Sequence, residues 1–98
     1  MDFISFEWDE KKSKTNFKKH KVSFDEAQTA FFDSNARIIF NPDHSKDEDR
    51  FVLLGLSSVL RLLVVCHCCR ENDGKIIRII SARKANKHEQ KQYESFLP

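Results

Sequence analysis

The sequence has little glycine or proline and no long hydrophobic run. Its 98 residues include only two Gly and two Pro, too few for a collagen-like or low-complexity chain. The longest apolar run, 62–66, is far shorter than the ~20 residues of a membrane-spanning helix. The first four residues lack the basic and apolar segments of a secretory signal. We therefore expect one folded domain over 1–98, located in the cytoplasm and not in a membrane.

The chain also has few cysteines, and they lie together. Cys66, Cys68 and Cys69 are an odd number with no separate partners, which is a poor disulfide framework. Cys66 and Cys68 would share one face of a strand, with Cys69 on the other. A metal site that includes His67 would need further ligands, because four contiguous residues cannot surround an ion tetrahedrally. We predict reduced thiols packed in a core, with no metal and no cofactor.

Charged side chains are unevenly distributed, although the net charge is only +2. Six lysines lie between Lys11 and Lys21, and six further Lys and Arg residues lie between Lys75 and Lys91. If the fold brings these segments together, they form one basic patch that can bind a nucleic acid. If it does not, they are two solvated helix faces, which is the commoner behaviour of lysine runs.

The start of the chain is typical of a short strand followed by a helix. Residues 4–8 alternate apolar and polar side chains, which predicts a strand. Asp9 can cap a helix over 10–20 through its side-chain oxygen. Phe17 is the main apolar residue of that helix, so we expect Phe17 to anchor the helix to the core.

A second helix is predicted directly afterwards. Ser23 and Glu26 have the spacing of a capping box, and Val22 and Ala27 have that of a hydrophobic staple. The polar residues 33–35 end this helix.

The second half of the chain is typical of four strands and a last helix. The strand candidates are residues 36–40, 50–56, 62–67 and 75–82, separated by polar turns at 41–45 and 71–74 and by 57–60. Asn86 and Glu89 have capping-box spacing, which predicts a helix through Phe96. The order is β-α-α-β-β-β-β-α. Because no helix separates the later strands, we predict an α+β fold, with an antiparallel sheet packed against the helices.

Short motifs along the chain resemble those of the BrnT toxins. The matching pieces are Phe6–Asp9, Asn16 with Lys19–His20, Val22–Phe24 with Glu26–Ala27, Asp43–His44, Arg50, Leu54–Ser57, Leu63–Val65 with His67 and Arg70, Ile77–Arg83, and Glu89–Tyr93. Their order and spacing make the chain similar to this family over 6–93, nearly its whole length.

The resemblance implies a fold, an activity and a partner. BrnT proteins are RelE-like toxins of bacterial type II toxin–antitoxin pairs. The implied activity is that of a metal-independent endoribonuclease, which cleaves mRNA and inhibits translation. The implied partner is a BrnA-type antitoxin, which neutralises the toxin and through which alone the pair contacts DNA. An acidic, amphipathic antitoxin segment would complement the basic surface. The alternative is a non-catalytic module that binds RNA or protein, for which the basic segments suffice.

Cleavage of RNA without a metal uses the neighbouring 2′-OH as nucleophile. It needs a base, an acid, and cations for the charged phosphorane. Arg83 is the first candidate for this last task, because the planar guanidinium binds two phosphate oxygens and stays charged. We place Arg83 just past the Ile-rich strand, where it can enter a groove. The alternative is a salt bridge to Glu89.

Further catalytic candidates lie on a strand and on the first helix. His67 is suited to acid or base chemistry, because the ordinary pKa of histidine lies near neutrality, or it is a hydrogen-bonded core residue. Arg70, near it, either binds phosphate or is only solvated. Lys19 and His20 end the first helix, where cations also favour the helix dipole. A short turn lets them approach Glu26, whose alternative role is capping.

Tyr93, on the last helix, either polarises a phosphate or base or simply packs at helical spacing with Phe96. His44 lies in an acidic loop, for which solvation is commoner than cation binding. Four more cations are candidates for RNA binding: Lys18, Arg78, Lys84 and Lys87. Arg78 alternates with isoleucines, so it points from one face of its strand.

Overall fold

A computed structural model describes residues 4–39, 50–69 and 75–98. The predicted turns at 41–45 and 71–74, with His44 and Arg70, lie outside the described residues. The elements are β1 (Ser5–Glu7), α1 (Glu10–His20), α2 (Phe24–Thr29), the 3₁₀ turn η1 (Ala30–Phe32), β2 (Arg37–Ile39), β3 (Arg50–Leu56), β4 (Leu62–Cys69), β5 (Ile76–Lys84) and α3 (Lys87–Glu94). The predicted order of strands and helices is confirmed, with η1 as an extra turn after α2.

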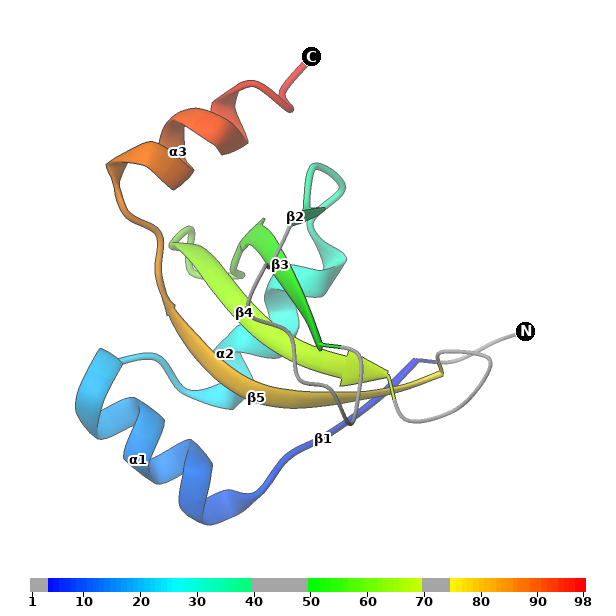
Figure 1. Cartoon of the computed structure of the whole chain (residues 1–98), viewed down its shortest axis with the longest axis vertical. Coiled ribbons are helices and arrows are strands. Elements are labelled where there is room, and N and C mark those ends of the chain that lie inside the picture. Colours follow the sequence, from blue (N-terminus) through cyan, green and yellow to red (C-terminus); the bar gives the residue numbers. More distant parts are fainter. Residues whose placement is uncertain (1–3, 40–49, 70–74) are drawn as a thin grey trace.

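The five strands form one sheet in the order β1-β5-β4-β3-β2. The pairs β2–β3, β3–β4 and β4–β5 are antiparallel, as expected from their short connections. The first strand departs from the predicted antiparallel sheet, because β1 pairs with β5 in parallel. Parallel pairing requires a long crossover, and the chain between β1 and β5 provides one. The sheet is therefore mixed (Figure 1).

Local capping interactions fix both ends of α1 and the start of α3. The Asp9 carboxylate accepts from the backbone N–H of Lys11 at 2.8 Å. Lys21 ends α1 in the left-handed conformation, with φ 61°, and its N–H donates to the Phe17 carbonyl at 2.8 Å. The Asn86–Glu89 capping box of α3 is complete in both directions. These predicted helix boundaries follow directly from local sequence.

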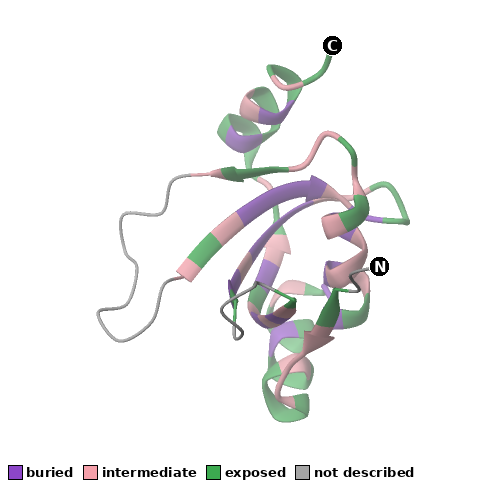
Figure 2. Ribbon diagram, turned by 90° about the vertical axis from the view of Figure 1, so that its right-hand side faces the viewer, coloured by how far each residue is buried: buried purple, intermediate pink, exposed green. Residues whose placement is uncertain are grey.

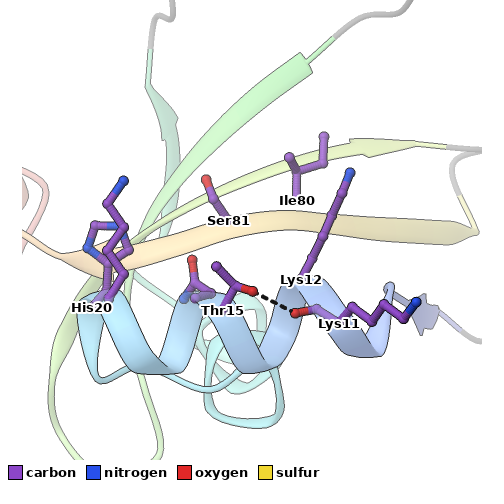
Figure 3. Close-up of a pocket in the computed structure, with 8 residues that line it drawn as sticks. Lys11, Lys12, Thr15, His20, Ile80 and Ser81 are labelled. Carbon is purple, nitrogen blue, oxygen red and sulfur yellow. Dashed lines mark hydrogen bonds between the residues drawn. The ribbon is translucent and has the colours of Figure 1, made fainter.

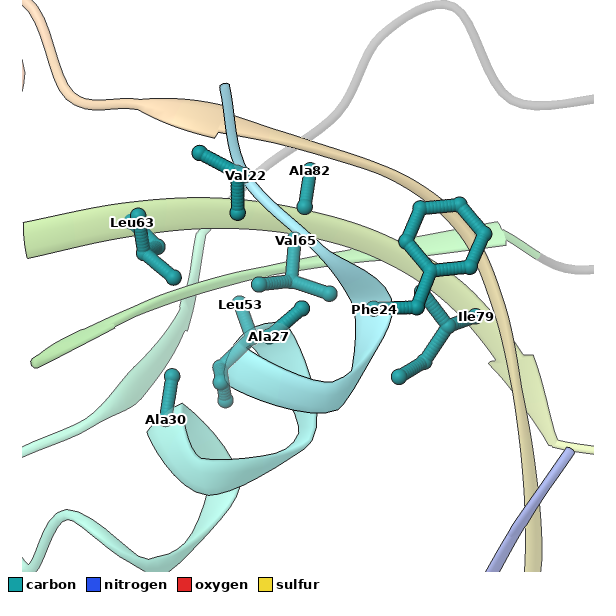
Figure 4. Close-up of a cluster of buried hydrophobic side chains, with 9 residues drawn as sticks. All are labelled: Val22, Phe24, Ala27, Ala30, Leu53, Leu63, Val65, Ile79 and Ala82. Carbon is teal, nitrogen blue, oxygen red and sulfur yellow. The ribbon is translucent and has the colours of Figure 1, made fainter. Parts of the chain in front are cut away.

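The helix-covered face of the sheet carries the larger core. It contains Val22, Phe24, Ala27 and Ala30 from the α2 region, packed on Leu53, Leu63, Val65, Ile79 and Ala82 of the sheet (Figure 4). Both members of the predicted staple, Val22 and Ala27, are fully buried here. A Cβ at Gly55 would lie 2.8 Å from the Ala30 carbonyl oxygen, so only glycine allows this approach of η1 to β3. Figure 2 shows that buried residues concentrate on the strands.

The opposite face of the sheet carries a smaller core beneath α3. Its buried members are Leu54, Val64 and Tyr93, with Val52 and Phe96 among the half-buried residues around them. In Figure 1, α3 lies at one end of the molecule, away from α1. α1 contributes neither to this core nor to the larger one.

Asn16, and not Phe17, attaches α1 to the sheet. The prediction for Phe17 is wrong, because its side chain is 52% exposed while Asn16 is 7% exposed. The Asn16 amide donates to the carbonyls of Val22 and Ala82, both at 2.8 Å, and accepts from the Ala82 N–H at 3.1 Å. β1 pairs with β5 only up to Arg78, so Ala82 lies on an open strand edge. Asn16 satisfies the backbone groups that such an edge leaves unpaired.

The three cysteines lie in different environments. Cys68 is buried, Cys66 is half-buried and Cys69 is exposed, so the expectation of core packing is right only for Cys68. In the described part of the chain, no three His, Cys, Asp or Glu residues lie close enough together to hold a metal ion. Nor is any described helix long and apolar enough to cross a membrane.

Candidate functional site

A basic groove lies between α1 and the edge of β5. Its volume is about 330 Å³, and its lining consists of Lys11, Lys12, Thr15, Asn16, Lys19, His20, Ile80 and Ser81. Figure 3 shows Lys12 extending from α1 past β5, whose Ile80 and Ser81 side chains point away from the helix. The hydrogen bonds of Asn16 to Ala82 orient this face of α1. Cations on one wall of a groove are what an anionic polymer requires.

A β-bulge shapes the strand wall of the basic groove. Cys66 of β4 pairs with Ser81, but the next residue, His67, pairs with Ile79, so β5 has an extra residue at Ile80. Successive strand residues normally point to opposite faces. The bulge interrupts this alternation, and Ile80 and Ser81 both line the groove.

A second hollow, the sheet pocket, opens beside α3. It has a volume of about 240 Å³ and is lined by Ile39, Val52, Val64, Cys66, Ser81, Arg83 and Glu89. Ser81 lines both the sheet pocket and the basic groove, so the two hollows meet at this residue. Together they form one surface that leads from the lysines of α1 to Arg83.

Arg83 is held by Glu89 in a two-fold ion pair. Its two terminal nitrogens donate to the two Glu89 oxygens, each at 2.8 Å. Glu89 Oε1 also accepts from the Asn86 N–H, so the start of α3 fixes the carboxylate. The Arg83 guanidinium holds the pKa of Glu89 below its usual range. The Glu89 salt bridge considered for Arg83 is therefore present, and Arg83 lines the sheet pocket and not the basic groove.

The position of Arg83 corrects one detail of the sequence analysis. β5 continues to Lys84, because Val64 pairs with Arg83 and Leu63 with Lys84. Arg83 therefore lies within the strand and not past its end. Its side chain remains 43% exposed, against 12% for Glu89, so the free edge of the guanidinium reaches solvent.

His67 lies in the core, on the helix-covered side. It is 3% exposed, and its ring packs edge-on against Phe31 with centroids 4.8 Å apart. Burial lowers the pKa of His67. Its Nδ1 lies 3.2 Å from the Val65 carbonyl. This environment matches the core alternative, and His67 lines neither hollow.

Glu26 pairs with Arg61 in place of Lys19 and His20. Ser23 accepts from the Glu26 N–H at 3.0 Å, but the Glu26 carboxylate does not return to complete the capping box. It instead accepts from Arg61 Nε at 2.9 Å and from the Ser57 hydroxyl at 2.7 Å. The bond from Arg61 lowers the pKa of Glu26. Glu26 thus ties α2 to the β3–β4 turn and does not line the basic groove.

Tyr93 attaches α3 to the body of the protein. The side chain is 8% exposed, and its hydroxyl donates to Asp33 Oδ2 at 2.6 Å. The same oxygen accepts from the Leu56 N–H at 2.9 Å. Burial and the Asp33 hydrogen bond raise the pKa of Tyr93 to about 12. This geometry matches the packing alternative.

The Tyr93 environment predicts a late alkaline titration. Tyr93 is the single tyrosine, so tyrosinate absorbance reports on it alone. The folded pKa lies above the ordinary 10.0, so the neutral phenol stabilises the fold below pH 10, and this stability is lost as pH rises toward about 12. We expect a native midpoint near 12 and a midpoint near 10 in urea. A native midpoint near 10 would contradict the buried hydrogen bond.

The predicted RNA-binding cations are distributed over several surfaces. Arg78 pairs with Glu7 across β1 and β5 at 2.9 Å. Lys84 lowers the pKa of Glu26, after the larger effects of Arg61, and is exposed, as is Lys87 at the start of α3. Lys18 lies on the other side of α1, in a hollow with Ser13, Lys14, Phe17 and Lys21. Among the catalytic candidates that the structure describes, Lys19, His20 and Arg83 are the ones brought to the joined hollows.

Sequence reasoning missed Lys12 and Ser81 as lining residues. Lys12 had a usable signal, because it lies seven residues before Lys19 and shares its helix face. Ser81 had none, because the bulge beside it depends on the pairing of β5 with β4.

The fold is that of a small α+β protein, with a mixed sheet and a cationic groove along one edge of it. The model of a family described as "Ribonuclease toxin, BrnT, of type II toxin-antitoxin system" matches residues 8–89. The chain therefore belongs to the BrnT family of ribonuclease toxins, as the sequence resemblance predicted. A toxin of a type II system has an antitoxin as its partner.

The fold is also similar to a solved structure, that of the Brucella abortus ribonuclease toxin, BrnT, at 1.1 Å resolution. The TM-score is 0.61 at 24% sequence identity, over 89% of this chain and 99% of that chain. The predicted α+β fold class is thus confirmed. No curated protein matches the chain.

Proposed function

We propose that this toxin is a metal-independent endoribonuclease that cleaves mRNA where the basic groove meets the sheet pocket. The position of Arg83 supports this most strongly. Its guanidinium is oriented by Glu89, remains partly exposed, and lies in a pocket that joins a cationic groove through Ser81. An oriented cation next to a path for the RNA backbone is what phosphate cleavage needs.

The basic groove would hold the RNA backbone. Lys12 and Lys19 lie on the groove face of α1, and neither forms an ion pair with a carboxylate in residues 4–39, 50–69 or 75–98. Lysine binds phosphate as a point charge, without reading the base. The groove therefore positions RNA, and the chemistry is assigned to its junction with the sheet pocket.

In the proposed reaction, the 2′-oxygen bonds to phosphorus as the bond from phosphorus to the 5′-oxygen breaks. A base takes the 2′ proton, and an acid gives a proton to the leaving 5′-oxygen. The products are a 2′,3′-cyclic phosphate and a 5′-hydroxyl. Arg83 binds the phosphorane, which carries more negative charge than the substrate. His20 lines the groove, and we assign it proton transfer because an imidazole nitrogen can accept or donate a proton.

Other predicted catalytic residues receive structural roles in this proposal. His67 fills the core, Glu26 binds Arg61, and Tyr93 binds Asp33. Lys18 faces away from the basic groove and is not assigned to RNA.

We further propose that cleavage of mRNA in the cytoplasm inhibits translation, and that a BrnA-type antitoxin neutralises the toxin. The pair would contact DNA only through the antitoxin. This follows the sequence resemblance, and the basic surfaces of the toxin support it by favouring an acidic antitoxin segment.

One observation favours a non-catalytic RNA-binding module instead. Both terminal nitrogens of Arg83 already donate to the Glu89 carboxylate in the chain without RNA, as those of a purely structural arginine would. In that case the lysines alone would bind RNA, and no bond would break.

Incubation of the purified chain with mRNA in excess EDTA tests the proposed function. We expect fragments with 5′-hydroxyl and 2′,3′-cyclic phosphate ends, because no step of the proposed reaction uses a metal. Mapping of the 5′ ends measures this. A salt-dependent gel shift with intact RNA, with or without Mg²⁺, would support the binding module. Cleavage only after Mg²⁺ is restored would contradict metal independence.

Lys19→Ala and Lys18→Ala are matched controls for the RNA path. They remove the same charge from adjacent residues on opposite sides of α1. We expect the Lys19 variant to reduce the salt dependence of RNA binding by about one phosphate contact, a change of ~0.7 in slope for single strands. The Lys18 variant should leave the slope unchanged.

A further inference from the structure

An outer patch on α1 and the β3–β4 turn has no role in the reaction proposed above. Its members are Lys14, Phe17, Lys18 and Lys21 of the α1 region, with Val59 and Leu60 of the turn. The apolar members are 52%, 63% and 77% exposed for Phe17, Val59 and Leu60. Arg61, next to Leu60, donates to the Lys21 carbonyl at 2.9 Å, which places the turn beside the end of α1.

The β3–β4 turn presents its apolar side chains on a firmly held backbone. The Ser57 N–H donates to the Arg61 carbonyl at 2.8 Å, and the Leu60 N–H donates to the Ser57 carbonyl at 2.9 Å. The Ser58 N–H donates to the Thr29 hydroxyl at 2.9 Å, which attaches the turn to α2. An exposed leucine on such a turn is presented to solvent with little freedom to fold back.

Leu60 also occupies a conformation that leucine disfavours. Its φ is 62°, in the left-handed region, and it is the last residue of a three-residue hairpin loop. Glycine is the usual residue at this position of such loops. The sequence therefore has a large apolar side chain at a position where the backbone conformation favours glycine. Leu60 is exposed, so this side chain adds no buried contact to the fold.

We propose that the outer patch is the docking surface for the antitoxin, which binds it with an acidic, amphipathic segment. This inference rests on the toxin–antitoxin part of the proposed function. In residues 4–39, 50–69 and 75–98, no carboxylate forms an ion pair with Lys14, Lys18 or Lys21. These lysines leave positive charge for an acidic partner beside exposed apolar side chains, and charge complementarity of this kind guides protein association.

The chemistry of the patch favours this occupant over two others. Single-stranded RNA gains its apolar contacts by stacking on aromatic rings, and of the three apolar members only Phe17 has a ring, while Val59 and Leu60 have none. A second copy of this chain would bring the same lysines against themselves, which like-charge repulsion opposes. A peptide segment with apolar and acidic side chains satisfies both features of the patch.

The test uses Leu60→Gly and Phe17→Ser in the full chain, with purified cognate antitoxin as the probe. Leu60→Gly removes the exposed side chain and suits the local backbone, so its thermal midpoint should not fall. We expect each variant to bind the antitoxin about tenfold or more weakly, and the double variant about 100-fold, as central interface residues do. Cleavage of RNA by the variants alone should match wild type. Leu97→Ala, which removes another exposed apolar side chain, should leave antitoxin binding unchanged.

The outcomes separate this inference from the proposed function. Unchanged antitoxin affinity in the folded double variant overturns the docking surface, while RNA cleavage by wild type still supports the enzyme. If the variants bind RNA more weakly but still bind the antitoxin as wild type does, the docking proposal is overturned and the outer patch is a surface that binds RNA. Weakened antitoxin binding by a chain that never cleaves RNA supports the docking surface and refutes the enzyme.

Discussion

Arg83→Ala is expected to slow RNA cleavage by about 10²–10³-fold while the chain stays folded. That is the usual loss when one oriented donor to a developing negative charge is removed from an active site. The guanidinium is positioned by its two bonds to Glu89, each 2.8 Å long, so little reorganisation would precede the reaction. Cleavage rates at saturating RNA, measured beside circular dichroism of the variant, check the prediction. A folded variant that cleaves at the wild-type rate would refute the role of Arg83.

Glu89→Gln separates catalysis by Arg83 from its structural role. The amide keeps an oxygen for the Asn86 N–H, so the start of α3 should remain capped. It loses the charge that pairs with Arg83. If Arg83 binds the phosphorane, this variant keeps the catalytic cation and loses only part of its orientation, so cleavage should slow less than in Arg83→Ala. If Arg83 only secures α3, then Glu89→Gln and Arg83→Ala should cause similar losses.

Features governed by neighbours in sequence were predictable. The Asp9 cap and the Asn86–Glu89 box set helix ends within a few residues, and both are present. The short connections between the later strands, with no helix among them, predicted their antiparallel order. The parallel pairing of β1 was not predictable in the same way, because three residues pair with a strand about 70 residues later in the chain.

The site was predictable only where a residue depends on its own element. Lys19 reaches the groove on the helix face that it shares with Lys12, and His20 follows it at the end of α1. His67, Glu26 and Tyr93 had plausible chemistry, but their partners are Phe31, Arg61 and Asp33, which the fold brings from distant positions. Residue type gives the chemistry that is available, and long-range packing decides whether it is used.

Asn16→Ala is expected to lower the free energy of unfolding by about 2–4 kcal/mol. Leaving a buried polar group without its partner costs about 1–3 kcal/mol, and this variant affects several. They are the Val22 carbonyl and both backbone groups of Ala82. Because the same bonds hold α1 against β5, RNA binding in the basic groove should also weaken. Equilibrium unfolding in urea and RNA binding at fixed salt measure the two effects.

Phe17→Ala is the matched control, one residue along the same helix. Its side chain is 52% exposed, so its loss should change the free energy of unfolding by no more than about 0.5 kcal/mol. Asn16→Asp should be as damaging as Asn16→Ala, because a carboxylate cannot donate to two carbonyls and would face them with negative charge. If Phe17→Ala lowered the free energy of unfolding more than Asn16→Ala, Phe17 and not Asn16 would be the residue that anchors α1. We expect the opposite, a larger loss of stability for Asn16→Ala than for Phe17→Ala. The buried Asn16 amide, bound to the open edge of β5, would then be the link between the core and the basic groove.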